Sequence, residues 1–187
     1  MPAKIYWLHK FESASRLGIM ARPRGNEWLE EDILSLGRQG VQIIVSLLDR
    51  NEIYELGLEK EAELCLKNAI EYINIPIADR NVPKSDPGFH NFISQLKEKI
   101  SAGRHMVIHC RMGIGRSTII AGCLLIKPGY KPDDIIAHVS KIRGLRVPDT
   151  DEQIDWLKKQ EQYICAGKVQ ASSKISSDCN KEGLANI

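Results

Sequence analysis

Short apolar runs alternate along the chain with longer segments that repeat apolar residues at helical spacing. The run 41–48, rich in β-branched residues, is typical of a strand covered on both faces, and 72–77 resembles a further strand. Helical spacing occurs in 29–36, 89–100 and 135–142. The alternation predicts an α/β fold, with a central, mostly parallel sheet of about four to five strands flanked by helices.

Cap residues and weaker runs refine this outline. The runs 5–8 and 17–20 are candidate opening strands. Asn26 is expected to cap the first helix, and Asp86, followed by proline, to cap the helix over 89–100. Thr150 and Gln153 have the spacing of a capping box at the start of the last helix.

The composition changes near residue 166. Ser, Lys, Asp, Asn and Gly dominate from there on, and little remains that could be buried. We therefore expect residues 1–165 to form one catalytic domain and residues 166–187 to form a disordered polar tail.

The segment 104–118 carries the clearest chemical signal. An apolar strand ends at His109, a loop with Gly113 and Gly115 follows, and a helix opens near Arg116. Loop amides and the positive end of a helix dipole bind oxyanions, and both glycines are expected to adopt dihedrals closed to other residues. The planar guanidinium can hold two phosphate oxygens. These features predict a phosphate-binding loop at the carboxyl edge of the sheet.

Two features distinguish this loop from a nucleotide-binding loop. Its first residue is Cys110, and the Gly-Lys-Ser/Thr ending of nucleotide-binding loops is absent. The positive field that binds phosphate also favours a thiolate. Asp79 follows the strand 72–77, and parallel strands end at one edge of a sheet. A carboxyl group and a thiolate are therefore expected to face one phosphate.

His109-Cys110-x5-Arg116-Ser117, with both loop glycines, resembles the signature loop of the protein tyrosine phosphatase superfamily. In its short length the chain is similar to the dual-specificity branch of this superfamily. The end of the loop resembles that of the kinase-associated and cell-cycle groups of the branch. This resemblance implies attack by Cys110, a phosphocysteine intermediate, and no metal or other cofactor. Asp79 would be the general acid, and Ser117 would donate a hydrogen bond to the sulfur. The predicted substrate-binding residues are Arg111, Met112, Gly113, Ile114, Gly115 and Arg116.

Four assignments leave alternatives open. Asp86 is a second candidate acid, although capping already explains it. Gln153 could orient the hydrolytic water, as a late Gln does in some relatives, or serve only in the capping box. His109 is interpreted as a loop organiser through backbone hydrogen bonds rather than as a base. Arg111 could contact acidic groups near the phosphate or remain solvated.

The net charge and the cysteines argue against several other classes of protein. The formal net charge of +2 argues against a general nucleic-acid or membrane-surface binder. Five cysteines without a Cys-x-x-Cys pair argue against a disulfide scaffold or a zinc site. No leader and no long apolar run are present in the sequence, so we expect a cytoplasmic protein with no membrane partner.

The leading hypothesis is a phosphatase that acts on protein phosphotyrosine, and on phosphoserine or phosphothreonine if the pocket is shallow. Its partners would be a phosphorylated protein and an oxyanion in the loop. The alternatives are a phosphatase of inositol phosphates, lipids or RNA 5′ ends, and a non-catalytic phosphate-binding module. Only Arg111 joins Arg116 as a basic loop residue, which favours protein substrates, and the presence of Cys110 and Asp79 favours an enzyme.

Overall fold

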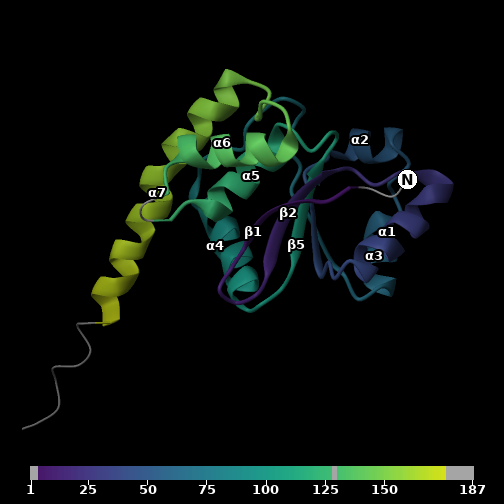
Figure 1. The fold of residues 1–187 in the computed structure, drawn as a ribbon, viewed down its shortest axis with the longest axis horizontal. Coiled ribbons are helices and arrows are strands. Elements are labelled where there is room, and N and C mark those ends of the chain that lie inside the picture. The colour runs from purple at the N-terminus through teal and green to yellow at the C-terminus, as the bar shows by residue number, and fades with distance from the viewer. Residues whose placement is uncertain (1–3, 128–129, 176–187) are drawn as a thin grey trace, which may run out of the picture.

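Figure 1 shows a computed structural model of the chain, which describes residues 4–127 and 130–175, with side chains up to Ile164. Within these residues, one five-stranded sheet is surrounded by helices. The strands are β1 (Tyr6–Lys10), β2 (Arg16–Ala21), β3 (Ile43–Ser46), β4 (Glu71–Asn74) and β5 (Met106–Cys110). The helices are the 3-10 helix η1 (Asn26–Trp28) and α1 (Leu29–Arg38), α2 (Arg50–Glu55), α3 (Glu61–Lys67), α4 (Pro87–Ser101), α5 (Arg116–Leu125), α6 (Pro132–Arg143) and α7 (Asp151–Ile175).

The strand order is β1-β2-β5-β3-β4, and every neighbouring pair is parallel except β1 and β2. The predicted fold class, a mostly parallel sheet of four to five strands, is therefore confirmed. β5 lies at the centre, where Cys110 is level with Ala21 of β2 and His109 with Ser46 of β3. The four parallel strands end at one edge, so the loops that follow β3, β4 and β5 gather there.

Helices cover both faces of the sheet (Figure 1), and an apolar core lies between the sheet and the helices on each face. Helices α4 to α7 pack on one face, where Met106, Ile108 and Cys110 point. Helices α1 and α3 pack on the other face together with Val107. This alternation along β5 follows from the two-residue period of a strand. The alternation therefore places the Cys110 side chain on the face that α5 covers, and not on the face that α1 covers.

Several local predictions are confirmed and one is wrong. The weak opening strands exist as β1 and β2, and Asp86 caps α4 by accepting a hydrogen bond from the Phe89 amide at 2.8 Å. Asn26 does not cap α1. It starts η1 with φ of 54°, and its amide donates to Gly57 O at 2.8 Å. The positive φ and the contact with a distant loop replace the expected cap.

The last helix extends further than the composition suggested. We expected the domain to end at residue 165, but the backbone of α7 is helical to Ile175. Residues 176–187, the rest of the predicted tail, lie outside the described residues, and the assignment of residues 1–165 to one catalytic domain stays a prediction. Among the described helices, none is both long and apolar enough to cross a membrane.

Candidate active site

Residues 110–116 form a bowl between β5 and α5, and we call this segment the bowl. Arg143, at the end of α6, holds its outer side by donating to Gly113 O at 3.0 Å and to Met112 O at 3.2 Å. In a trans peptide the N–H points opposite to the C=O, so these contacts turn the next amides toward the inside. Within the described residues, no protein acceptor pairs with the amides of Met112 to Ser117. They remain available for an oxyanion.

The two loop glycines are required for different reasons. Gly113 has φ of 67°, and a Cβ there would lie 2.4 Å from the carbonyl carbon and oxygen of Met20. The expectation of a special backbone conformation is therefore confirmed for Gly113. It is wrong for Gly115, whose φ of −81° is open to any residue. A Cβ on Gly115 would instead lie 2.3 Å from Asp149 Oδ1 and 2.6 Å from Gln153 Oε1.

The Arg116 guanidinium is almost fully buried and held on two sides. Its Nη1 donates to Glu52 Oε2 at 2.7 Å and to Ile77 O at 2.8 Å. Its Nη2 donates to Glu52 Oε1 at 2.8 Å and to Asp79 Oδ1 at 2.9 Å. The paired bonds to Glu52 fix the plane of the fork. Sequence reasoning missed this carboxylate.

Glu52 remains ionised because it has charged and polar donors around it. Burial alone would raise its pKa, but hydrogen bonds from Arg116 and from the Asp49 amide outweigh burial and hold the pKa below its usual value. Asp49 and Glu52 also form a capping box at the start of α2, directly after β3. That spacing was visible in the sequence, but not the direction of the Glu52 side chain.

Cys110 lies at the bottom of a cavity of about 230 Å³. Its side chain is 3% exposed, and its Sγ is 3.5 Å from Ser117 Oγ. The lining residues are Asp79, Arg80, Cys110, Arg111, Met112, Ile114, Gly115, Arg116, Asp149 and Gln153. The structure thus brings the sulfur, the guanidinium and the Asp79 carboxylate together, as the topology predicted. Asp86 does not line this cavity and serves as the cap of α4.

His109 lies on the opposite face of the sheet from the sulfur. Its Nε2 is 3.0 Å from Glu61 Oε1 on α3, and both side chains are fully buried. Its backbone oxygen accepts a hydrogen bond from the Leu47 amide at 3.0 Å. The carboxylate partner was not foreseen, because Glu61 stands in a highly charged segment that gives no sign of burial.

The remaining loop side chains take different positions. Arg111 donates to Glu55 Oε1 at 2.5 Å, so its charge is paired rather than turned into the bowl. Met112 is 59% exposed at the mouth of the cavity, and Ile114 is partly buried along its wall. Arg116 is therefore the guanidinium that the structure fixes at the bowl, and Arg80 and Arg111 also line the cavity.

Gln153 approaches the bowl from the start of α7. Its amide N–H donates to Thr150 Oγ1 at 3.2 Å, which is one half of the predicted capping box. The side chain does not return to the cap. Its Nε2 donates to Asn81 O at 3.2 Å, beside the Asp79 loop, and the residue is fully buried. Asp149, which sequence reasoning missed, lies next to it and also lines the cavity.

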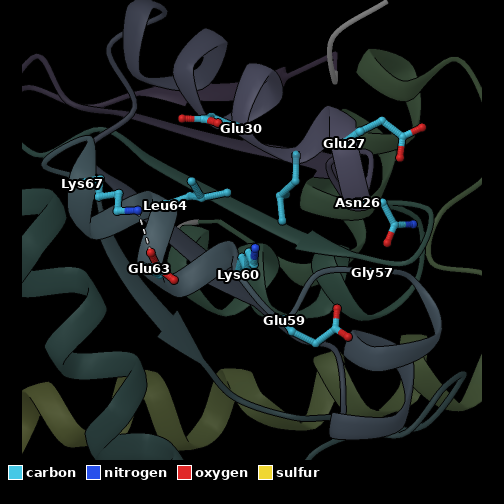
Figure 2. A pocket seen from close by; sticks show the side chains of 10 residues that line it. Asn26, Glu27, Glu30, Gly57, Glu59, Lys60, Glu63, Leu64 and Lys67 are labelled. Atoms are coloured by element: carbon cyan, nitrogen blue, oxygen red, sulfur yellow. Dashed lines mark ion pairs between the residues drawn. The ribbon is translucent and has the colours of Figure 1, made fainter.

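A larger hollow of about 490 Å³ lies elsewhere, between η1, α1 and α3 (Figure 2). Charged side chains surround it, including Glu27, Glu30, Glu59 and Lys60, and an ion pair of 2.6 Å joins Lys67 to Glu63. None of its lining residues belongs to the bowl. Of these two cavities, the smaller one places a cysteine sulfur beside an anion cradle, and it is therefore the candidate active site.

Comparison with known proteins agrees with this geometry. A protein-family model described as "Polymorphic toxin system, DSP-PTPase phosphatase" matches residues 18–130. The chain therefore belongs to the DSP-PTPase phosphatase family. This places it among the protein-tyrosine and dual-specificity phosphatases, the class that its signature loop resembles.

Three individual relatives share about a quarter or less of their residues with the chain. The cyclin-dependent kinase inhibitor 3 of Rattus norvegicus is 24% identical over 176 residues, which cover 88% of this chain and 82% of the relative. A crystal structure of kinase-associated phosphatase, with its catalytic-site cysteine replaced by serine, has a TM-score of 0.79 at 24% identity and covers 88% of this chain and 97% of that one. PTPMT1 in complex with PI(5)P has a TM-score of 0.67 at 17% identity, with coverages of 89% and 99%.

Proposed function

We propose that the chain hydrolyses phosphate monoesters of protein tyrosine, and of serine or threonine, through a phosphocysteine on Cys110. The observation that carries the proposal is the placement of the Cys110 sulfur at the bottom of a bowl of unpaired amides completed by Arg116. A reactive sulfur and an oxyanion cradle in one cavity are the requirements of covalent phosphoryl transfer.

In the first step Cys110 Sγ attacks phosphorus, and the bond from phosphorus to the leaving oxygen breaks. The electron pair goes to that oxygen, which takes a proton from Asp79. Asp79 now contacts Arg116 Nη2, where an oxygen of bound phosphate would compete with it. Substrate binding would thus release Asp79 from the guanidinium and turn it toward the leaving oxygen.

In the second step water attacks the phosphocysteine, the P–S bond breaks, and the electron pair returns to the sulfur. Ser117 Oγ, 3.5 Å from Sγ, is placed to donate to the departing thiolate. The bowl amides and Arg116 hold the equatorial oxygens in both steps. No step requires a metal or another cofactor, because the reacting groups all come from side chains and water.

The size and charge of the cavity support a protein substrate. A volume of about 230 Å³ suits a phosphoryl group and the atoms next to it, not a whole inositol ring with several phosphates. Within the bowl, Arg111 is already paired with Glu55, which leaves Arg116 as its phosphate-binding guanidinium. The similarity to kinase-associated phosphatase points the same way.

A hydrolysis panel tests the proposal. Phosphotyrosine and phosphothreonine peptides, inositol phosphate, PI(5)P vesicles and an RNA 5′-triphosphate should be compared with wild type and Cys110→Ser. We expect turnover of the phosphopeptides, with phosphotyrosine fastest, and its loss in Cys110→Ser. Preferred turnover of PI(5)P, which PTPMT1 binds, or of RNA would replace the protein assignment, and activity that survives loss of the sulfur would exclude the covalent route.

A further inference from the structure

The loop between β4 and α4 carries Asp79 and is mostly exposed. Within it the Asn81 amide donates to Ala78 O at 3.0 Å, so Asp79 and Arg80 are the central residues of a turn. Arg80 has φ of 58°, a left-handed conformation that is strained for a residue other than glycine. A strained turn on the surface persists when the surrounding structure holds it. The shape of the Asp79 turn therefore depends on contacts from outside the loop.

Helix α7 supplies two of these contacts. Gln153 Nε2 donates to Asn81 O at 3.2 Å, and Gln160 Nε2 donates to Ser85 Oγ at 2.8 Å. The two glutamines are two helical turns apart, so they lie on one face of α7, about 10 Å from each other along its axis. One face of α7 therefore holds the Asp79 loop at two points.

The Gln160 amide is 1% exposed, and burying an amide is unfavourable unless its hydrogen bonds are satisfied. Both ends of this amide have partners. Nε2 also donates to Trp156 O at 3.3 Å, and Oε1 lies 3.1 Å from His90 Nε2 on α4. A carbonyl oxygen can only accept, so the contact with Trp156 identifies the nitrogen end of the amide. These bonds fix the plane of the amide and direct Nε2 to Ser85.

The start of α4, which follows the Asp79 loop, is docked on α7 as well. The His90 ring stacks on Tyr163 with ring centroids 5.0 Å apart. Phe89 packs edge-on against Trp156 with ring centroids 5.3 Å apart. The far end of the loop is thus anchored by ring contacts and by the Gln160 amide together, and the loop can move only if α7 releases it.

We propose that Gln160 is a positioning residue for the Asp79 carboxyl, and that α7 thereby sets the rate at which the leaving oxygen is protonated. The proposal rests on the general-acid role of Asp79 in the proposed function. When phosphate displaces Asp79 from Arg116, only the side chain has to rotate, because the turn beneath it is held. Without the Gln160 contact the loop samples other positions, and the carboxyl is aligned for a smaller fraction of the time. Gln160 does not line the cavity of Cys110, so attack by the sulfur is not affected directly.

The dependence of kcat/KM on the leaving group separates this role from a structural one. Gln160→Leu should lower kcat/KM about tenfold for phosphotyrosine and alkyl phosphates. For p-nitrophenyl phosphate it should stay within about twofold of wild type, because nitrophenolate leaves without a proton. Ser85→Ala removes the loop end of the same bond at an exposed position and should show the same selectivity with a smaller loss. Gln162→Leu, at an exposed position of the same helix, is the matched control and should behave as wild type.

A double-mutant cycle tests whether Gln160 acts through Asp79. In an Asp79→Asn background, Gln160→Leu should cause no further loss on phosphotyrosine. Losses that multiply in the double variant, a uniform loss across leaving groups, or no loss in Gln160→Leu would each overturn the inference. Should Gln160→Leu not fold, Ser85→Ala with Asp79→Asn gives the same cycle. If Asp79→Asn alone slows all substrates equally, or if Cys110→Ser stays active, the proposed function itself has failed.

Discussion

The bowl and the side chains around it are built in different ways. The bowl is one continuous segment, residues 110–116, whose shape follows from a strand, a left-handed glycine and a helix start. The surrounding side chains come from three separate places: Glu52 after β3, Asp79 after β4, and Gln153 at the start of α7. Anion binding is therefore fixed locally, whereas proton transfer depends on how distant loops pack.

Two contacts join these regions. Arg116 belongs to the bowl, but its guanidinium is held by Glu52 and by Ile77 O. Gln153 connects α7 to the Asp79 loop through Asn81 O. Changes inside the bowl should therefore abolish binding and chemistry together, and changes around it should affect individual steps.

The largest effect is expected where the two regions meet. Arg116→Lys replaces the planar fork by a single ammonium, which cannot bond Glu52 on two sides and also hold a phosphate oxygen. We expect kcat/KM to fall by about 10³-fold, as measured with a phosphotyrosine peptide. A loss below tenfold would show that the fork geometry is not needed.

Gly113→Ala tests the bowl alone. The new Cβ would lie 2.4 Å from the Met20 backbone. The alanine would also have to adopt the φ of 67° that Gly113 has. Turnover should fall by about 10²-fold because the amides are displaced. Gly103→Ala is the control, since Gly103 has φ of 89° but its Cβ would have ordinary contacts only. It should lose about 1–2 kcal/mol of unfolding free energy and keep its activity. Equal activity of the two variants would contradict the account.

Asp79→Asn tests a surrounding side chain. The amide keeps a similar shape but cannot protonate a leaving oxygen. For phosphotyrosine and alkyl phosphates we expect losses of about 10²-fold in kcat, and for p-nitrophenyl phosphate a much smaller loss, because nitrophenolate leaves without a proton. A uniform loss across leaving groups would instead indicate a structural role.

Glu52→Gln should have the smallest effect on turnover, about tenfold, because Ile77 O still holds the guanidinium.

The unfolding free energy of the Glu52→Gln variant should also depend on pH differently from that of wild type. The pKa of Glu52 is lowered by folding, so its ion pair stabilises the native state above the usual value of 4.5 and is lost as pH falls below it. Denaturant unfolding between pH 6 and about pH 3 should show a steeper acid loss in wild type than in Glu52→Gln. Parallel curves would contradict this assignment.

The sequence predicted what depends on chain continuity and strand direction. The bowl, its anchoring strand and helix, and the meeting of Asp79 with Cys110 all follow from those two features. Side-chain direction in separate segments could not be predicted in this way. Glu52 and Glu61 stand among exposed charges in the sequence yet are buried against Arg116 and His109. The role of Gly115 depends on α7, which is distant in the chain.

Asn26 shows the same limit at the level of secondary structure. An Asn before an apolar helix is a good cap by local rules, but here Asn26 bonds to Gly57 O, and α1 starts at Leu29. A tertiary contact has replaced a local preference. The prediction of a capping box at Thr150 was half correct for the same reason. The Gln153 backbone amide donates to Thr150 Oγ1, but the Gln153 side chain donates to Asn81 O instead of returning to the cap.

Alkylation of Cys110 in the presence of phosphate tests most directly whether one bowl both activates the sulfur and seats the anion. Burial raises the pKa of Cys65 and of Cys123 to about 12, so iodoacetate should leave these two thiols unmodified at pH 7. We predict rapid alkylation of Cys110, measured by peptide mass spectrometry, and saturable protection by inorganic phosphate that is lost in Arg116→Lys. Slow alkylation of Cys110, or alkylation that phosphate does not affect, would contradict the account.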